Sequence, residues 1–274
     1  MSKDSENIGK LAIVTGASSG IGFELATQFA KHGFDLVICA AHDDIQQAAT
    51  GLSQYGTHVD AVKADLSTQD GVETFMETVR AGKRPIDAAA LNAGFGIDGY
   101  FWETDLAEEV KLINTNVVGT VHLAKLVVQD MIANGKGGKI MFTSSVASLA
   151  PGPYMACYNA SKAFVQSFSH ALHHELKEKG ISVTTLMPDA TDTDFFDGMQ
   201  DTKVGQAKKD DPAYVAERGY EAMMEGKAQV LGGTLKHRLL NAVEDLIPEQ
   251  TKAKMYGKQA KPGSAAEDSA KKAS

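Results

Sequence analysis

The sequence is poor in cysteine and in positive charge, and it contains no long apolar run. Its two cysteines among 274 residues, Cys39 and Cys157, are far apart, so we expect no disulfide and no metal site. The formal net charge of -8 argues against nucleic acid, because phosphate binding needs clustered cations. No run reaches the ~18 apolar residues of a membrane span, and we expect no signal peptide. These absences predict a cytoplasmic protein that binds neither nucleic acid nor a membrane.

What the chain does contain is an alternation of strand-like runs and amphipathic segments. Apolar runs predict strands at 10–14, 35–39, 58–62, 86–91, 139–143 and 182–187, with an edge strand at 228–231. Most are nearly continuous in apolar residues, as in a parallel sheet covered on both faces. The pattern predicts one Rossmann-like, doubly wound α/β domain of three layers over residues 1–250. Residues 251–274 lack an apolar face and predict a flexible tail, with a short helix docked on a partner subunit as the alternative.

A glycine-rich turn lies between the first predicted strand and the first predicted helix. Gly16, Gly20 and Gly22 follow the spacing G-x-x-x-G-x-G. Without Cβ atoms the backbone bends sharply, and a pyrophosphate can approach the free N–H groups at the helix N-terminus. The turn therefore predicts a dinucleotide site, although a tight strand-to-helix connection without a ligand has the same composition.

Two polar residues on a later predicted helix suggest acid–base chemistry. Tyr158 and Lys162 are four apart, so their side chains share one face of the helix. A phenol with a pKa near ~10 is a poor acid–base group at neutral pH, and a nearby ammonium lowers that pKa. The pair predicts a proton-transfer site. Taken alone, it is also typical of a solvated helix face, and Asn116 alone is typical of a polar helix residue.

The chain resembles the short-chain dehydrogenase/reductase family in several motifs that occur in the family's order. They are the run from Thr15 to Gly22, Asn92-Ala-Gly94, Asn116-Val-Val-Gly119 and Tyr158-Asn-Ala-Ser-Lys162. The resemblance implies an NAD(P)-dependent oxidoreductase that interconverts a secondary alcohol and a carbonyl. Its implied catalytic residues are Asn116, Ser145, Tyr158 and Lys162.

The resemblance also implies what each of these residues does. Tyr158 is the acid–base, and Lys162 also holds the nicotinamide ribose. Asn116 anchors a water-linked proton path. Ser145 binds the substrate oxygen, and the family's spacing favours it over Ser144.

The cofactor is expected to contact residues from several loops. The implied contacts are Gly16, Ser18, Ser19, Gly20, Ile21, Gly22, His42, Asp65, Leu66, Asn92, Ala93, Gly94, Tyr158, Lys162, Pro188, Thr191 and Thr193. Asp65 resembles the family residue near the adenine, although it or Ser67 is also suited to cap the next helix.

The choice between the two dinucleotides depends on the end of the second strand. The NAD-selecting carboxylate is replaced by Ala40, and Ala41 replaces the arginine that often selects NADP. His42 and Ser18 are candidates to contact a phosphate, which Asp43 and its neighbour Asp44 would oppose. We expect NADP(H) to be favoured over NAD(H), with His42 as an ordinary surface residue left open.

The substrate end of the predicted site is apolar. The expected substrate contacts are Ser145, Phe95, Met155 and Phe195. The wider rim is expected to include Phe101, Trp102, Ala147, Pro151 and Met199. These suggest a small, mostly apolar substrate. Asp189 replaces a glycine that the family often has after Pro188, which leaves the contacts of Thr191 and Thr193 open.

Two other functions and an assembly are compatible with these residues. A non-catalytic dinucleotide-binding sensor or scaffold is the alternative from another class, and an epimerase or dehydratase is a third possibility. By resemblance, the predicted helices at 105–131 and 154–179 pair across a two-fold axis. The resemblance therefore implies a homodimer or a homotetramer.

Overall fold

One parallel sheet organises the chain. The computed structural model describes residues 6–193, 195, 199–233 and 248–265. Its strands run in the order β3-β2-β1-β4-β5-β6-β7, and every neighbouring pair is parallel. The strands are β1 (Leu11–Thr15), β2 (Asp35–Ala40), β3 (Val59–Lys63), β4 (Ala88–Leu91), β5 (Gly138–Thr143), β6 (Ile181–Met187) and β7 (Gln229–Leu231). All seven overlap the ranges predicted from the sequence, and the single doubly wound α/β domain is confirmed.

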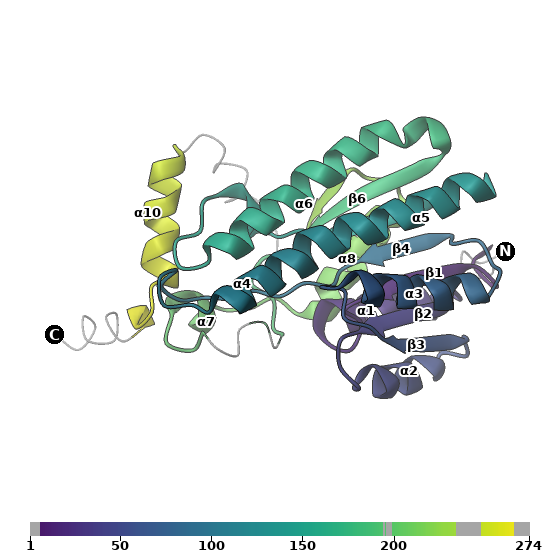
Figure 1. Ribbon diagram of the computed structural model, residues 1–274, viewed down its shortest axis with the longest axis horizontal. Coiled ribbons are helices and arrows are strands. Elements are labelled where there is room, and N and C mark those ends of the chain that lie inside the picture. The colour runs from purple at the N-terminus through teal and green to yellow at the C-terminus, as the bar shows by residue number, and fades with distance from the viewer. Residues whose placement is uncertain (1–5, 194, 196–198, 234–247, 266–274) are drawn as a thin grey trace.

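Helices cover both faces of this sheet (Figure 1). The α-helices are α1 (Gly20–Lys31), α2 (Ile45–Ser53), α3 (Gln69–Ala81), α4 (Leu106–Ile113), α5 (Thr120–Asn134), α6 (Ala156–Glu175), α7 (Lys203–Gln206), α8 (Pro212–Met224) and α10 (Glu249–Ala260). Short 3-10 turns form η3 (Val146–Leu149) and η4 (Lys177–Lys179). Among the described residues, no helix is both long enough and apolar enough to cross a bilayer.

Each strand supplies side chains to two separate cores because successive residues point to opposite faces. In β1, Ala12 and Val14 join the core under α1 and α8. Leu11 and Ile13 join the core under α3, α5 and α6. Burial of a large aliphatic side chain stabilises the fold by about 1.5–3 kcal/mol. The nearly continuous apolar runs therefore follow from a sheet that is covered twice.

The strand order reverses beside β1, which has β2 on one side and β4 on the other. Strands β1 to β3 extend the sheet one way and β4 to β7 extend it the other way. In such sheets the crevice beyond the carboxyl ends of the strands, at the point of reversal, is where ligands bind. Here that place lies beyond Thr15 and Leu91.

A π-helical turn interrupts the long helix predicted over residues 105–131. This turn, η2 (Asn114–Gly119), joins α4 to α5. It lies close to the loop after β3, since a Cβ on Gly119 would be 2.1 Å from the carbonyl oxygen of Leu66. Such turns occur often at functional sites, and this one carries Asn116.

The C-terminal region differs from the expectation. We predicted a flexible tail from residue 251, but residues 249–260 form α10, which docks on its own chain. Lys252 is buried, and its Nζ donates to the carbonyl oxygen of Leu149 at 3.1 Å. The sequence shows no apolar stripe here because a polar contact anchors the helix. Residues 266–274 lie outside the described part of the chain.

Candidate active site

The glycine turn folds tightly against the ends of two strands. Gly16 and Gly20 have φ values of +64° and +55°, a region that favours glycine. A Cβ on Gly22 would lie 1.9 Å from the carbonyl oxygen of Gly16, and one on Gly16 would lie 2.9 Å from the Cα of Ala93. All three glycines are therefore required by backbone contacts or by conformation.

The N-terminus of α1 is open to an anion. Its N-cap residue, Ser19, makes no side-chain capping hydrogen bond, and no acidic residue lies in the first turn. The first N–H groups of the helix have no partner within the helix itself. With the helix dipole, they suit the phosphates of a dinucleotide. Ser18 and Ile21 lie in the same turn, partly exposed.

Thr15 and Asn92 join β1 to β4 at the floor of the crevice. Thr15 Oγ1 accepts the backbone N–H groups of Asn92 and Ala93, both at 3.0 Å. In return, Asn92 Nδ2 donates to the carbonyl oxygens of Thr15 at 3.2 Å and of Gly16 at 3.4 Å. Asn92 and Ala93 thus hold the two loops together. Thr15 begins the motif but was not among the predicted contacts.

Asn116 connects the loop after β4 to α6. Its Nδ2 donates to the carbonyl oxygen of Phe95 and to Ser161 Oγ, both at 3.0 Å, and its Oδ1 accepts from the N–H of Phe95 at 3.1 Å. Ser161 in turn donates to the carbonyl oxygen of Tyr158 at 2.7 Å. Asn116 is therefore linked through Ser161, which was not predicted, to the backbone of Tyr158.

Tyr158 and Lys162 lie buried on the inner face of α6. Lys162 Nζ donates to the carbonyl oxygen of Thr143 at 2.9 Å and lies 5.8 Å from the centroid of the Tyr158 ring. A Cβ on Gly94 would be 2.9 Å from Asn116 Oδ1 and 3.2 Å from Lys162 Nζ. Gly94 is therefore packed against both polar groups, because a larger residue would collide with Asn116 Oδ1.

The pKa values of this pair are shifted toward the neutral forms. Burial raises the pKa of Tyr158 to about 12, although a hydrogen bond with Ser145 lowers it in part. Burial lowers the pKa of Lys162 to about 8. We predicted that the ammonium would lower the pKa of the phenol. In this structure burial raises that pKa instead, and Lys162 Nζ donates to the carbonyl oxygen of Thr143.

The two serines after β5 make different contacts. Ser144 donates from Oγ to the carbonyl oxygen of Lys162 at 2.8 Å and so holds the helix that carries the site. Ser145 Oγ accepts from the N–H of Ala147 at 3.1 Å and donates to the carbonyl oxygen of Pro188 at 3.4 Å, and its hydroxyl lowers the pKa of Tyr158. Ser145 is thus the serine that shares an environment with the phenol.

The loop after β6 lies beside two other loops, the one that carries Ser144 and Ser145 and the glycine turn. The carbonyl oxygen of Pro188 accepts from the N–H of Val146 at 2.9 Å. A Cβ on Gly20 would lie 2.9 Å from the methyl carbon of Thr193, which brings that side chain to the glycine turn. Thr191 is buried and donates to the carbonyl oxygen of Asp189 at 2.8 Å. Asp189 itself accepts from the next N–H of the chain at 2.8 Å.

The end of the crevice where we expect the adenosine is more exposed than the end that carries Tyr158. His42 is exposed after β2. Burial alone would raise the pKa of Asp65, but hydrogen bonds from Ser67 bring it below the usual value. Neither Asp65 nor Ser67 caps α3, because the N-cap of that helix is Thr68, whose side chain accepts from the N–H of Gly71. Asp65 is left in a turn at the carboxyl end of β3, with Leu66 following it.

An apolar cluster covers Tyr158. It contains Leu112, Met155, Tyr158 and Met199, packed against Phe95, Ile97, Ala147, Cys157, Ala190, Phe195 and Val204. The ring of Phe195 lies 4.9 Å from that of Tyr158, centroid to centroid. Phe101 and Trp102, which we placed on the rim, are instead 63% and 77% exposed, and Pro151 is exposed as well. These three do not belong to the cluster.

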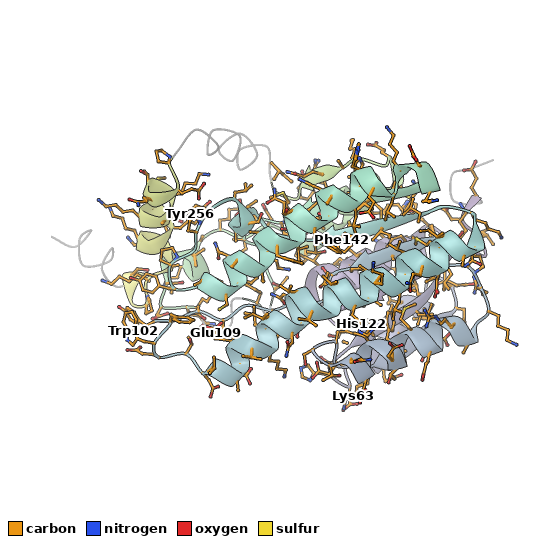
Figure 2. All side chains as sticks on the ribbon, turned by 45° about the horizontal axis from the view of Figure 1, so that its top comes forward. Lys63, Trp102, Glu109, His122, Phe142 and Tyr256 are labelled. Atoms are coloured by element: carbon orange, nitrogen blue, oxygen red, sulfur yellow. The ribbon has the colours of Figure 1, made fainter. Side chains whose placement is uncertain are left out.

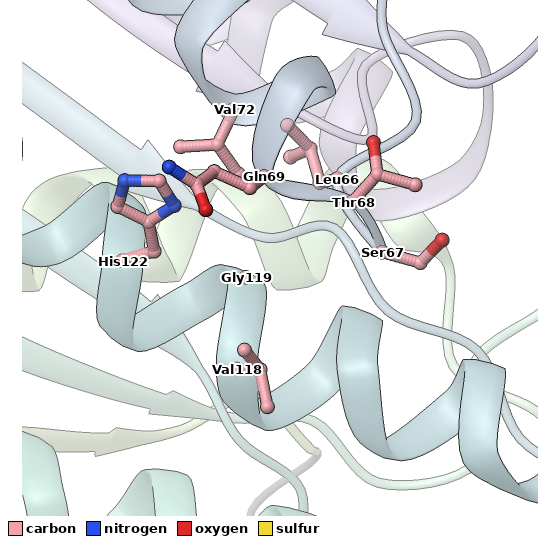
Figure 3. A pocket seen from close by; sticks show the side chains of 8 residues that line it. All are labelled: Leu66, Ser67, Thr68, Gln69, Val72, Val118, Gly119 and His122. Atoms are coloured by element: carbon pink, nitrogen blue, oxygen red, sulfur yellow. The ribbon is translucent and has the colours of Figure 1, made fainter.

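A separate cavity of about 280 Å³ lies between α3 and α5 (Figure 3). It is lined by Leu66, Ser67, Thr68, Gln69, Val72, Val118, Gly119 and His122. Of the predicted site residues only Leu66 reaches it, and no residue of the apolar cluster does. This cavity is therefore distinct from the crevice that carries Tyr158.

Comparison with known proteins agrees with this geometry. The family model described as short chain dehydrogenase matches residues 10–203. The chain is 30% identical over 252 residues to a very-long-chain 3-oxoacyl-CoA reductase of Anas platyrhynchos, covering 89% of this chain and 78% of that one. Two solved structures are also similar. A short-chain dehydrogenase from Sphingobium yanoikuyae in complex with NADPH has a TM-score of 0.77, 28% identity and coverage of 86% and 93%. A short-chain dehydrogenase/reductase from Burkholderia phymatum in complex with NAD has a TM-score of 0.78, 26% identity and coverage of 88% and 93%.

Proposed function

The chain belongs to the short-chain dehydrogenase family of oxidoreductases, and from this premise we propose that it is an NADP(H)-preferring enzyme that interconverts a secondary alcohol and a carbonyl. The observation that carries the proposal is the set of contacts that gathers Asn116, Ser145, Tyr158 and Lys162 in one place beside Gly94. These groups lie at the carboxyl ends of the strands, next to an uncapped helix N-terminus.

The residues present fit a dinucleotide. The glycine turn and the start of α1 would hold the pyrophosphate, and Lys162, beside Gly94, would bind the nicotinamide ribose. Asn92, Ala93, Pro188, Thr191 and Thr193 would form the walls. When bound, the nicotinamide supplies or accepts the hydride.

Tyr158 would move the proton. With its pKa raised to about 12, the phenol is protonated at neutral pH, which suits donation to a carbonyl oxygen. Ser145 would donate a second hydrogen bond to the same oxygen. Asn116 keeps α6 in place through Ser161, so that Tyr158 and Ser145 face one substrate atom.

A cation at the end of β3 supports the preference for NADP(H). Lys63 pairs in register with Ala40, the position where a carboxylate would select NAD. Its Nζ lies 2.7 Å from Asp43 Oδ2, and its side chain is 54% exposed. Lys63 therefore offsets the acidic residue that we expected to oppose a 2′-phosphate, and it can reach the phosphate together with His42. The sequence analysis missed Lys63 because only strand pairing brings it beside β2.

The substrate that fits best is small and mostly apolar. The described residues around Tyr158 form an apolar cluster that includes Phe95, Met155 and Phe195. A relative is named as a very-long-chain 3-oxoacyl-CoA reductase, which supports the apolar character of the substrate and not its small size.

Assembly as a homodimer or homotetramer is part of the same proposal. The outer face of α4 and η2 exposes Leu106, Val110, Ile113 and Val118, and α6 exposes Phe164. A partner that covers these side chains would remove apolar surface from water. The proposed location remains the cytoplasm, on the basis of the two widely separated cysteines.

Cofactor titration followed by a carbonyl panel tests the proposal. Nicotinamide fluorescence should show NADPH binding about 10-fold more tightly than NADH, and a panel of ketones and alcohols should show turnover. Tyr158→Phe should lower kcat about 10²- to 10⁴-fold while NADPH binding is unchanged.

Two results would count against it. Tight cofactor binding with no turnover across the panel would favour the non-catalytic sensor, an alternative supported by Asp189 and by the cover of Phe195 over Tyr158. Unchanged turnover in Tyr158→Phe would reject the role of the phenol.

A further inference from the structure

The last described segment of the chain, residues 248–265, packs beside the loops at the substrate end of the site. Figures 1 and 2 show α10 at the end of the molecule near the starts of α4 and α6. The segment is held at two places. One contact reaches the turn that follows Ser145, and the other reaches the loop that carries Met199.

The first contact depends on a buried lysine. Lys252 is 5% exposed, although charged side chains are rarely buried without partners. Its Nζ donates to the carbonyl oxygen of Leu149 and to Glu249 Oε1, both at 3.1 Å. The Glu249 side chain is 65% exposed. The ammonium group of Lys252 is therefore withdrawn from solvent, and it is bonded to a backbone carbonyl of a distant segment.

That carbonyl belongs to the turn that begins at Ser145. Ser145 is the N-cap of η3, in which Leu149 is the last residue. Asn159 of α6 donates from Nδ2 to the carbonyl oxygens of Ala147 at 2.8 Å and of Ala150 at 3.1 Å. Lys252 holds the carbonyl of Leu149 between them. The turn is thus fixed by α6 on one side and by α10 on the other.

The second contact fixes the opposite loop. The N–H of Gly263 donates to Asp201 Oδ2 at 2.8 Å, and the N–H of Lys203 donates to Ser264 Oγ at 3.0 Å. Ser264 is 1% exposed. Two residues before Asp201 is Met199, which is buried in the apolar cluster with Tyr158. The segment therefore spans two walls of the same apolar cluster.

We infer that Lys252 is a positioning residue, which fixes the Ser145 turn relative to Tyr158 and makes the C-terminal segment part of the substrate site. Lys252 contacts neither substrate nor cofactor in this role. The inference rests on the proposed function, because it assigns Lys252 to the step in which Ser145 binds the substrate oxygen. The hydrogen bonds described above join the segment to the Ser145 turn and to the loop that carries Met199, both on the substrate side, so cofactor binding should not depend on it.

The test compares Lys252→Met with Lys252→Arg in the full chain, with Lys254→Met as the matched control. Lys254 lies on the same helix and is exposed. Lys252→Met should lower kcat/KM for a responsive ketone about 10- to 100-fold, mainly through kcat, because small misplacements at a reacting centre are costly. The Kd for NADPH should stay within about twofold, as for a distant site. Lys252→Arg should recover most of the activity, and Lys254→Met should match the unaltered protein.

Hydrogen exchange gives a readout that does not need turnover. The N–H groups of Val146, Ala147 and Ser148 all have acceptors in the turn or beside it. In the cofactor-free protein, Lys252→Met should make these three exchange faster while amides of the glycine turn are unchanged.

The outcomes separate the inference from the proposed function. If the unaltered protein binds NADPH but reduces no carbonyl, the proposed function fails, and the exchange of residues 146–148 still decides the positioning role. Unchanged kcat/KM and unchanged exchange in Lys252→Met would overturn the inference. A parallel loss of NADPH binding would overturn it as well, because that would indicate a general loss of structure.

Discussion

The cofactor half and the substrate half of the crevice are built by different means. On the cofactor side, the glycine turn lies so close to the β4 loop that a hypothetical Cβ on Gly16 would be 2.9 Å from the Cα of Ala93. The motif residues Thr15 and Asn92 add hydrogen bonds between the two loops. On the substrate side, side chains from distant segments hold the loops, as in the contact of Lys252 with Leu149 across 103 residues of chain. Backbone contacts impose residue types that are visible in sequence, whereas distant side-chain contacts leave no local pattern.

Substitution of Gly22 should give the largest effect in this comparison. Gly22→Ala places a methyl group against Gly16 O and Asn92 Nδ2, so the turn must distort. We expect the free energy of unfolding to fall by about 4 kcal/mol, and NADPH binding to be lost, measured by denaturant titration and fluorescence.

The matched control for that change is Gly51→Ala in α2. A Cβ on Gly51 meets only the ring of Phe23, at 3.9 Å. This helical position should become more stable by about 0.5–1 kcal/mol. Equal losses in the two variants would show that the glycine turn is not specially constrained.

The adjacent serines test the substrate half. Ser145→Ala removes the hydroxyl next to Tyr158 and should lower kcat/KM about 10²-fold, with NADPH affinity unchanged. Ser144→Ala removes the bond to Lys162 O and should mainly cost about 1 kcal/mol of stability. Steady-state kinetics and thermal melts of both variants separate the roles, and a reversed pattern would transfer the substrate contact to Ser144.

Stability as a function of pH probes the groups shared by both halves. The pKa of Lys162 is lowered from 10.5 to about 8, so between these values the folded protein holds fewer protons than the unfolded chain. The free energy of unfolding should therefore rise with pH across that window. Lys162→Met should lose this rise and be more stable than the unaltered protein below pH 8, by about 1–3 kcal/mol after the lost bond to Thr143 is allowed for.

Thermal melts from neutral to alkaline pH measure this difference. The raised pKa of Tyr158, about 12, lowers stability above pH 10 in both proteins and cancels in the comparison. Lys254→Met should follow the unaltered protein throughout. If the stability of Lys162→Met changed with pH in parallel with that of the unaltered protein, Lys162 would not be desolvated in the fold.

The smallest effect is expected at the adenosine end, where solvent screens the charges. Lys63→Ala should weaken NADPH binding by about 1 kcal/mol and leave NADH binding unchanged. Asp43→Asn should have the opposite sign for NADPH, since it removes a carboxylate 2.7 Å from Lys63 Nζ. If Lys63→Ala weakened the binding of NADPH and NADH equally, Lys63 would not contact the 2′-phosphate.

The sequence allowed the sheet to be predicted because strands buried on both faces, such as β1 and β2, have nearly continuous apolar runs. It also indicated Tyr158 and Lys162 through their helical spacing. It did not reveal the direction of Lys162 Nζ toward Thr143, nor the desolvation that dominates both pKa values. Burial and hydrogen-bond partners depend on which segments meet, and spacing along the chain does not determine that.

The position of Lys252 has a consequence for how relatives of this protein diverge. The part of the chain that matches the family model ends at residue 203, and the buried lysine comes 49 residues later. If Lys252 positions the Ser145 turn as proposed, a substitution in α10 can alter the substrate side of the crevice while the glycine turn and the Tyr158–Lys162 pair stay as they are. Two paralogues with the same glycine turn and the same tyrosine–lysine pair need not share a substrate.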